Sequence, residues 1–195
     1  MGRFQWKFFE VLKMRVSAII IDDFYADPMS VRNFALSQEF GVRGNFPGCR
    51  TKSFLTDDVK AAIEYNMQFA GKITETFSDS GYTGAFQIAT AQDRTWIHSD
   101  PHNMWAGVCY LTPDAPGSGG TGLFRHKETG EHFKVTEDHE GYDYTKWELF
   151  DRIGNKFNRL VIYRGDFFHA SLDYFGDNLQ NGRLFQTFFF NTEQV

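Results

Sequence analysis

Short apolar runs, polar turns and helical stripes follow one another in the first third of the chain. Residues 17–21 form a β-branched run that ends at acidic turn residues, a pattern typical of a strand. Asp27 stands where it can cap a helix, and Pro28 suits the first helical position. Apolar residues then keep to one face, so we expect a helix over residues 28–40 and a glycine- and proline-containing loop over residues 41–52.

A longer helix is predicted over residues 57–77. Apolar side chains recur there at steps of three or four, which is the spacing of one helical face. Asp57 and Asp58 would lie in the first turn, where carboxylates stabilise a helix. The recurring apolar positions are Val59, Ile63, Met67, Ala70, Ile73 and Phe77.

Beyond residue 84 the pattern changes to short runs of β-branched and aromatic residues, which predict strands. Helices that precede about eight strands favour an α+β fold with a double-stranded β-helix core, of the jelly-roll or cupin-like kind. We expect one domain over residues 1–195, with a helical buttress over about 27–80 and the β-helix core over about 84–191. The predicted strands after the helices are residues 85–90, 94–97, 105–111, 122–125, 160–163 and 184–190.

Composition and charge exclude several classes of protein. Aromatic residues make up 17% and the net charge is −5 without a basic cluster, which argues against disorder and against a nucleic-acid partner. Residues 4–13 mix charge into an apolar run and no small-residue cleavage site follows, so they make a poor signal peptide. No apolar stretch is long enough for a transmembrane helix, so no membrane partner is expected. Two cysteines, Cys49 and Cys109, cannot form a cysteine zinc site, and reduced thiols predict a cytoplasmic protein.

Residues 125–146 are the most polar part of the chain. They hold ten charged residues and three histidines, and we interpret them as an exposed insertion. Such a segment is either solvated surface or a lid over a substrate site, and the sequence leaves both open.

His98 and Asp100 are the strongest candidates for chemistry. At the end of a strand, alternation would point both side chains to the same face. If His169 lies on a neighbouring strand, the three form the two-histidine, one-carboxylate triad that binds Fe(II) in non-haem oxygenases. The same three ligand types also bind zinc in hydrolases. His102 is predicted to be a surface or loop residue, not a ligand.

Arg183 begins the last apolar run of the chain. A guanidinium that projects from this strand into an apolar interior would need an anion, whereas on an edge strand it would pair with a surface carboxylate. The spacing alone does not separate these two interpretations.

The ordered set of these residues resembles the 2-oxoglutarate- and Fe(II)-dependent dioxygenase superfamily, on its prolyl-hydroxylase-like branch. The resemblance covers residues 16–191, including the 158–166 segment that leads into the second histidine. It rests on His98-x-Asp100, Tyr110-Leu111-Thr112, Gly119-Gly120-Thr121, His169 and Arg183.

The resemblance implies a role for each of these residues. His98, Asp100 and His169 would hold Fe(II), Arg183 would bind the far carboxylate of the cosubstrate 2-oxoglutarate, and Tyr110 would assist it. The implied reaction consumes O2, releases succinate and CO2, and hydroxylates an unactivated C–H bond of a small molecule, amino acid or peptidyl side chain. Thr112 stands where prolyl hydroxylases usually have asparagine, so the resemblance does not imply that the substrate is peptidyl proline.

Four residues are candidates for substrate contact. Arg50 is preferred because a charged side chain after a Pro-Gly loop is better suited to binding than to a core. Arg94 and Trp96 lie beside the His-x-Asp motif, and Trp105 follows it. The alternative function is a metal-containing jelly-roll module that binds a sugar or protein without turnover. The sequence predicts neither the oligomeric state nor the identity of the substrate.

Overall fold

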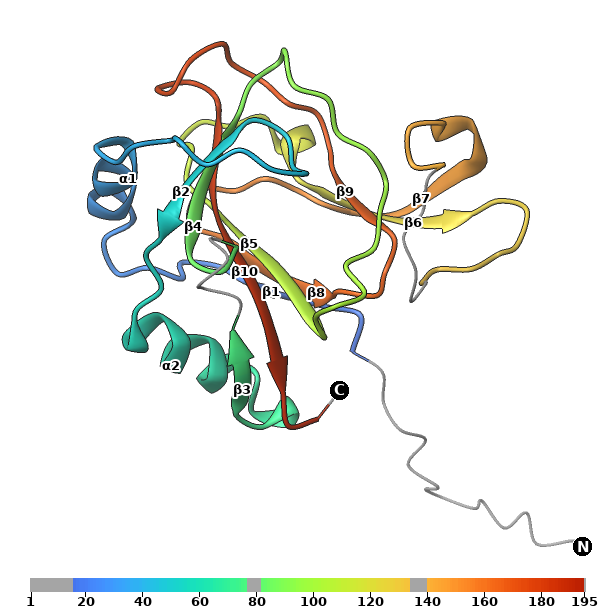
Figure 1. Ribbon diagram of the computed structural model, residues 1–195, viewed down its shortest axis with the longest axis horizontal. Helices are drawn as coiled ribbons and strands as arrows, with labels where there is room; N and C mark the ends of the chain where they lie inside the picture. Colours follow the sequence, from blue (N-terminus) through green and yellow to red (C-terminus); the bar gives the residue numbers. More distant parts are fainter. Residues whose placement is uncertain (1–15, 77–81, 134–139, 195) are drawn as a thin grey trace, which may run out of the picture.

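The computed structural model describes residues 16–76, 82–133 and 140–194, which form mostly antiparallel sheets with few helices. The larger sheet has seven strands, six of them in the order β1-β8-β5-β10-β4-β2, while β3 pairs with the far end of β10. Figure 1 shows β10 as a long strand through the middle of this sheet. The bounds are β1 Ala18–Ile21, β8 Leu160–Arg164, β5 Trp105–Tyr110, β10 Arg183–Thr192, β4 Ala85–Ala89, β2 Cys49–Ser53 and β3 Ile73–Thr76.

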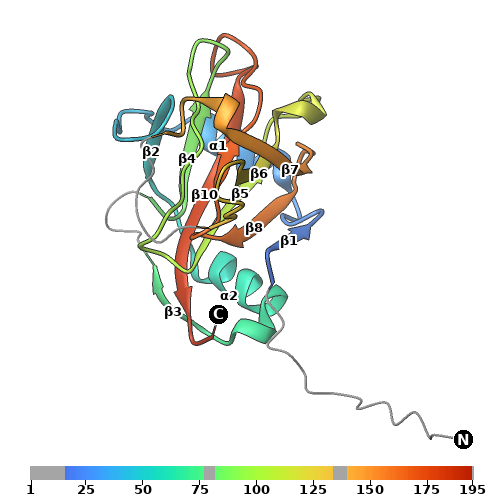
Figure 2. The same cartoon turned by 90° about the vertical axis from the view of Figure 1, so that its right-hand side faces the viewer.

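A smaller sheet of three strands, in the order β7-β6-β9, lies on one side of the larger one (Figure 2). Its strands are β7 Trp147–Ile153, β6 Thr121–His126 and β9 His169–Ser171. Side chains of both sheets meet in a shared apolar cluster that includes Val108, Val161, Phe185, Leu123 and Ile153. The two sheets therefore face each other across an interior, as in a jelly roll.

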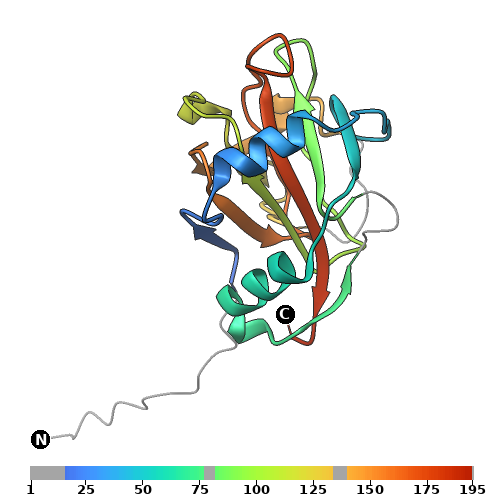
Figure 3. The same cartoon turned by 90° about the vertical axis from the view of Figure 1, so that its left-hand side faces the viewer.

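Two α-helices cover the opposite face of the larger sheet (Figure 3). Asp27 caps α1, Pro28–Leu36, by accepting a hydrogen bond from the Ser30 backbone N–H. Thr56 caps α2, Asp57–Asn66, in the same way. Their apolar faces pack on the main core of the protein. Short 3₁₀ turns occur at Gln68–Ala70, Gly117–Gly119 and Tyr144–Lys146.

Alternate side chains of strand β10 point to opposite faces of the larger sheet, and both faces are covered. Leu184, Phe188 and Phe190 belong to the core under the helices. Phe185 and Phe189 point the other way and line the space between the sheets. This alternation explains why the run reads as apolar throughout: both faces of the strand are covered.

The predicted helix over residues 57–77 is wrong beyond Asn66. Gly71 has φ of 76°, which a helix does not accept, and β3 follows at Ile73–Thr76. Three of the four residues of β3 are β-branched, and they pair with the end of β10. The spacing of Ile73 matched a helical face by coincidence, and Phe77 lies outside the described residues.

Other boundaries also differ from the prediction. The first helix ends at Leu36, not at residue 40. The predicted loop over 41–52 contains most of β2, and residues 94–97, predicted as a strand, are irregular up to an isolated bridge at His98. Strand β7 escaped prediction because its middle residues are mostly solvent-exposed and charged.

The polar segment 125–146 connects β6 to β7, and β6 itself runs on to His126. Residues 127–131 are exposed, whereas residues 134–139 lie outside the described residues.

The segment 4–13, which the sequence predicts to be a poor signal peptide, also lies outside the described residues. Within the described ranges, none of the helices combines the length and the apolar character needed to cross a bilayer.

Candidate functional site

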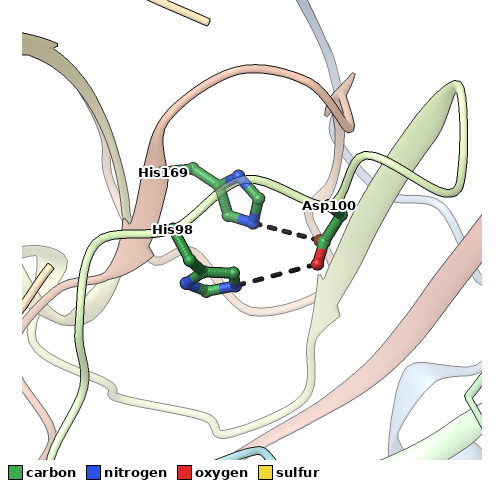
Figure 4. Close-up of side chains that lie close together, drawn as sticks. All are labelled: His98, Asp100 and His169. Atoms are coloured by element: carbon green, nitrogen blue, oxygen red, sulfur yellow. Dashed lines mark ion pairs between the residues drawn. The ribbon is translucent and has the colours of Figure 1, made fainter. Parts of the chain in front are cut away.

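His98 and His169 come from segments 71 residues apart and face each other across an isolated antiparallel bridge. The His98 N–H donates to the His169 carbonyl at 3.0 Å, and the His169 N–H donates to the His98 carbonyl at 2.8 Å. These two backbone bonds bring the imidazole ring centroids to 4.5 Å (Figure 4). The second histidine therefore does lie beside the first.

Each imidazole is held with the same nitrogen facing inward. His98 Nδ1 lies 3.0 Å from the Trp96 carbonyl oxygen, and His169 Nδ1 lies 2.8 Å from the Phe167 carbonyl oxygen. A carbonyl only accepts, so Nδ1 carries a proton in both rings, and Nε2 is the nitrogen that faces the Asp100 carboxylate. Hydrogen bonds of this kind orient histidines that ligate metals.

Asp100 completes the group. Its backbone N–H donates to the Gly165 carbonyl at 2.6 Å, which anchors the turn after His98. Its carboxylate oxygens lie 3.3 Å from His169 Nε2 and 4.0 Å from His98 Nε2 (Figure 4). The three side chains thus converge, and the ligand atoms all lie within 4.8 Å of one another.

The protonation states suit a metal. Burial, reinforced by the nearby His169, lowers the pKa of His98, so its ring is neutral at pH 7. Burial acts to raise the pKa of Asp100, but the hydrogen bond and charge of His169, with His98 and Arg50, hold that pKa below its usual value. The set therefore includes a neutral His98 imidazole and an ionised Asp100 carboxylate at pH 7.

The spacing fits an octahedral ion bound on one face. Facial ligand atoms about 2.1 Å from such an ion are about 3.0 Å apart. Asp100 to His169 at 3.3 Å is close to this value, and Asp100 to His98 at 4.0 Å needs only a small rotation. The residues present can therefore hold a divalent metal and leave further coordination positions to other ligands.

Arg183, at the start of β10, is fully buried. Its Nε donates to the Gly119 carbonyl at 2.8 Å and its Nη2 to the Gly120 carbonyl at 3.1 Å. Nη1 is buried and has no hydrogen-bond partner. The surface interpretation of Arg183 is thus wrong: the guanidinium is fixed inside the protein with one donor unused, which is the state expected of an anion-binding arginine.

Tyr110 lies beside this arginine. Its ring centroid is 5.3 Å from the Arg183 guanidinium carbon, and its hydroxyl shares a 2.7 Å hydrogen bond with Thr121 Oγ1. Burial raises the pKa of Tyr110, so the phenol keeps its proton. The structure thus brings Tyr110, Arg183 and the first residue of β6 together.

A cavity of about 580 Å³ opens between the two sheets and contains the His98, Asp100 and His169 side chains. Its size is within the range of small-molecule sites. The floor is formed by β-strand residues that face away from the helices, and the rim by loops. Further lining residues are Phe46, Arg50, Tyr82, Gln87, Trp96, Val108, Thr121, Tyr142, Tyr163, Ser171, Tyr174, Phe185, Thr187 and Phe189.

The four candidate substrate contacts divide into two pairs. Arg50 and Trp96 line the cavity. Arg94 is exposed and is not among the lining residues, because the segment before His98 is irregular and turns its side chain to solvent. Trp105 is fully buried in the core under the helices, where its Nε1 donates to Thr192 Oγ1 at 2.9 Å. His102 is exposed at the rim and offers no ligand atom to the triad.

Sequence reasoning missed several lining residues, among them Gln87, Thr187, Tyr142 and Tyr174. Gln87 and Thr187 carried a signal, since each is a polar residue inside an otherwise apolar strand. Tyr142 and Tyr174 lie on loops, and no local pattern placed them near the triad.

The solved structures that are similar to this one include two oxygenase-fold proteins with a TM-score of 0.50 or more. HygX from Streptomyces hygroscopicus, with nickel and 2-oxoglutarate bound, is 9% identical with a TM-score of 0.56, over 91% of this chain and 83% of that chain. A Trichoplax adhaerens prolyl hydroxylase, in complex with a hypoxia inducible factor oxygen degradation domain peptide fragment, is 12% identical with a TM-score of 0.50, over 91% and 84%. The chain thus has a prolyl-hydroxylase-like 2-oxoglutarate oxygenase fold, which confirms the resemblance at this level.

Comparison of the sequence with curated proteins finds no match. A family model described as "Family of unknown function (DUF6445)" matches residues 3–146. The matched segment includes Arg50, His98 and Asp100 and ends before His169 and Arg183. It spans more than half of the 195 residues, and the chain therefore belongs to DUF6445, a family of unknown function.

Proposed function

We propose that this protein is an Fe(II)- and 2-oxoglutarate-dependent oxygenase that hydroxylates an unactivated C–H bond of a small molecule, amino acid or peptidyl side chain. His98, Asp100 and His169 would hold the iron. Arg183 would bind the far carboxylate of 2-oxoglutarate, with Tyr110 beside it.

One observation carries this proposal: a facial triad lines the cavity, and a buried arginine with an unused donor lies 4.3 Å from the ring of Phe185, which lines the same cavity. The triad alone would also suit a zinc hydrolase or a metal-containing binding module. Arg183 is what separates these functions, because its Nη1 is buried without a partner. Burying an unsatisfied cationic donor is costly, and a bound carboxylate would satisfy it.

Iron at the triad would supply the redox chemistry by which 2-oxoglutarate and O2 yield succinate and CO2, with the second oxygen atom inserted into the substrate C–H bond. The protein positions the reactants. The Gly119 and Gly120 carbonyls fix the plane of the Arg183 guanidinium, and the carbonyls of Trp96 and Phe167 fix the two imidazoles. All these partners are backbone groups, which makes the site rigid.

The cavity walls near the triad are largely aromatic and aliphatic. The Tyr163 ring centroid lies 4.6 Å from that of His169, and Val108 and Phe185 line the same floor. These walls shield the side of His169, whose side chain is only 4% exposed, and a bound substrate would cover the more open side of His98 and Asp100.

An anaerobic titration tests the proposal without knowledge of the substrate. Fe(II) and 2-oxoglutarate added to the wild-type protein are expected to produce the weak visible charge-transfer band of a chelated keto acid. His169→Ala should abolish the band because it removes a metal ligand. His102→Ala is the matched control, since this neighbouring imidazole is not part of the triad.

The outcomes separate the functions clearly. A band in the wild type and in His102→Ala, but not in His169→Ala, supports the oxygenase. If folded wild-type protein binds Fe(II) but gives no band with 2-oxoglutarate, the cosubstrate assignment fails and a metal-containing binding module becomes the better hypothesis.

A further inference from the structure

Another buried arginine, Arg50, lines the cavity that contains the triad. It belongs to β2, opposite Gln87 of β4. Gly48, two residues earlier, has φ of 70° and runs so close to β4 that a Cβ atom there would lie 1.9 Å from the Ile88 carbonyl oxygen. Glycine at this position lets the chain approach β4 and turn the Arg50 side chain inward, where it is only 5% exposed.

The guanidinium is positioned but not neutralised. Its Nε donates to Gln87 Oε1 at 2.7 Å, and Gln87 is itself held by a 2.7 Å bond from its amide to the Pro47 carbonyl. The Nη1 group is buried and has no hydrogen-bond partner. None of the ion pairs found within residues 16–76, 82–133 and 140–194 includes Arg50.

Aromatic rings surround the positive charge. The guanidinium carbon lies 3.9 Å from the ring centroid of Phe46, 5.2 Å from that of Tyr82 and 5.7 Å from that of Phe189. Rings attract a cation through their faces, but they do not satisfy its N–H donors. Burial lowers the pKa of Arg50 to about 10, so the group still carries its charge at pH 7.

Arg32 is a buried arginine whose two terminal nitrogens both have hydrogen-bond partners, unlike those of Arg50. It is 7% exposed, and its Nη1 and Nη2 donate to the carbonyls of Leu111 and Gln180 at 2.8 Å and 2.6 Å. Arg32 belongs to α1 and ties this helix to the loops that hold Leu111 and Gln180. Arg50 instead faces the cavity that contains the triad, and its donor remains unused.

Arg50 and Arg183 contact different parts of the floor. Arg183 lies 4.3 Å from the Phe185 ring, whereas Arg50 lies near Phe189, four residues further along the same strand. At about 3.3 Å per residue, these positions are about 13 Å apart. The two arginines therefore offer two separate anion sites, and one 2-oxoglutarate molecule leaves the second site free.

We propose that Arg50 binds a carboxylate of the substrate that is to be oxidised, an inference that rests on the proposed oxygenase function. A carboxylate is favoured over a phosphate because Arg50 is the only lysine or arginine among the described residues that line the cavity, and Asp100 already contributes a negative charge there. The single positive charge of one guanidinium balances the single negative charge of one carboxylate. The planar guanidinium also matches the geometry of the two carboxylate oxygens.

The body of the substrate would then pack on aromatic rings. Trp96 and Tyr142 lie at 5.5 Å between centroids with an angle of 32°, and Trp96 is also 5.6 Å from the His98 ring. Together with Phe46 and Tyr82 they give the cavity apolar faces on the path from Arg50 to the metal ligands. The substrate class is accordingly a small carboxylic acid with an apolar or planar body.

A matched pair of probes tests this inference: 3-phenylpropanoate and its neutral analogue 3-phenylpropanamide. Their dissociation constants are measured by ligand-observed NMR on protein loaded with Zn(II) and saturated with 2-oxoglutarate, so that the metal and Arg183 are already occupied. The acid should bind at least about tenfold more tightly than the amide, because it gains a charge-assisted hydrogen bond to Arg50.

Arg50→Met should reduce this acid-to-amide ratio to about one while 2-oxoglutarate affinity stays within about threefold. Arg50→Gln is a second neutral variant that retains an amide to reach Gln87, in case Arg50→Met does not fold. Arg43→Met is the matched control: Arg43 is an exposed arginine of the same loop that donates to the Gly48 carbonyl, and its loss should leave the ratio unchanged.

Three results would overturn the inference. The first is that the acid binds the wild-type protein no more tightly than the amide, and the second is that the preference persists in both Arg50 variants. The third is a loss of 2-oxoglutarate affinity in these variants, which would make Arg50 the cosubstrate contact. If the wild type binds no 2-oxoglutarate at all, the proposed function fails instead, and the same two probes still test Arg50 in an Arg183→Met background.

Discussion

Replacement of Arg183 by methionine is the sharpest test of cosubstrate binding. The side chain is fully buried, and two of its nitrogens are bonded to the Gly119 and Gly120 carbonyls. These bonds leave Nη1 as the unpartnered donor. Methionine keeps a similar length and apolar stem but cannot bond an anion, so the substitution removes the anion contact with little change in volume.

The expected magnitude follows from the number of bonds lost. A hydrogen bond to a charged group contributes about 1.5–3 kcal/mol, and truncating one partner of a buried charge pair costs about 2–5 kcal/mol. Nη1 is one nitrogen, so we expect a loss of about 2–4 kcal/mol. This corresponds to a rise of about 30-fold to 700-fold in the dissociation constant of 2-oxoglutarate.

Isothermal titration of the Zn(II)-loaded protein measures this effect, with a second ligand as internal reference. The ligand 2-oxopentanoate has a methyl group in place of the far carboxylate of 2-oxoglutarate. Arg183→Met should weaken 2-oxoglutarate strongly and 2-oxopentanoate by less than about threefold, and the difference between the two is the coupling energy of the contact. Arg125→Met, which removes a half-buried arginine of β6 that pairs with Glu148, should change neither affinity.

Two results would refute this reasoning. If the substitution weakens both ligands equally, Arg183 supports the shape of the site and does not contact the far carboxylate. If folded Arg183→Met binds 2-oxoglutarate as tightly as the wild type, the unpartnered donor has another purpose and the cosubstrate site lies elsewhere.

Three further predictions concern the metal, the core and the thiols. A saturating divalent metal should raise the melting temperature of the wild type and of His102→Ala but not of His98→Ala, because only a bound ligand stabilises the fold; an equal shift in all three would contradict the triad. Trp105→Phe should lower the free energy of unfolding by about 1–3 kcal/mol in urea titrations while leaving 2-oxoglutarate affinity unchanged, because this ring is core, and altered affinity would show otherwise. Burial raises the pKa of Cys109 far more than that of Cys49, so iodoacetamide at pH 8 should label Cys49 first; mass spectrometry showing equal labelling of native protein would disprove this.

The strands of the core were largely predictable because their patterns are local. β5 and β10 are apolar on both faces, and such runs have no other stable place than between two layers. Strand β7 lacks such an apolar pattern and was not predicted. It lies at the edge of the small sheet and exposes most of its residues to solvent. The helix over 57–77 failed for a different reason. The α-helix already ends at Asn66, Gly71 with φ of 76° follows a 3₁₀ turn, and the pairing of β3 with β10 is a long-range contact without a local signal.

The triad was predictable because order and spacing carry much of its geometry. Residues two apart in an extended segment share a face, and this holds for His98 and Asp100 although residues 94–97 form no strand. His169 was harder, since its position depends on a bridge between segments 71 residues apart. The resemblance to a family supplied that pairing, and the two backbone hydrogen bonds between the histidines now give its physical basis.

The sequence favoured Arg50 over Arg94 because Arg50 follows a Pro-Gly loop, but a position after a loop does not determine which way a side chain points. What separates them is strand register. β2 pairs with β4 so that Arg50 stands opposite Gln87, on the face that lines the cavity. A shift of one residue would turn Arg50 towards the helices, where Phe86 and Ile88 pack. A substrate-binding role for Arg50 therefore depends on the same close approach at Gly48 that sets this register, and substitutions at Gly48 should impair carboxylate binding even though this residue has no side chain to contact a ligand.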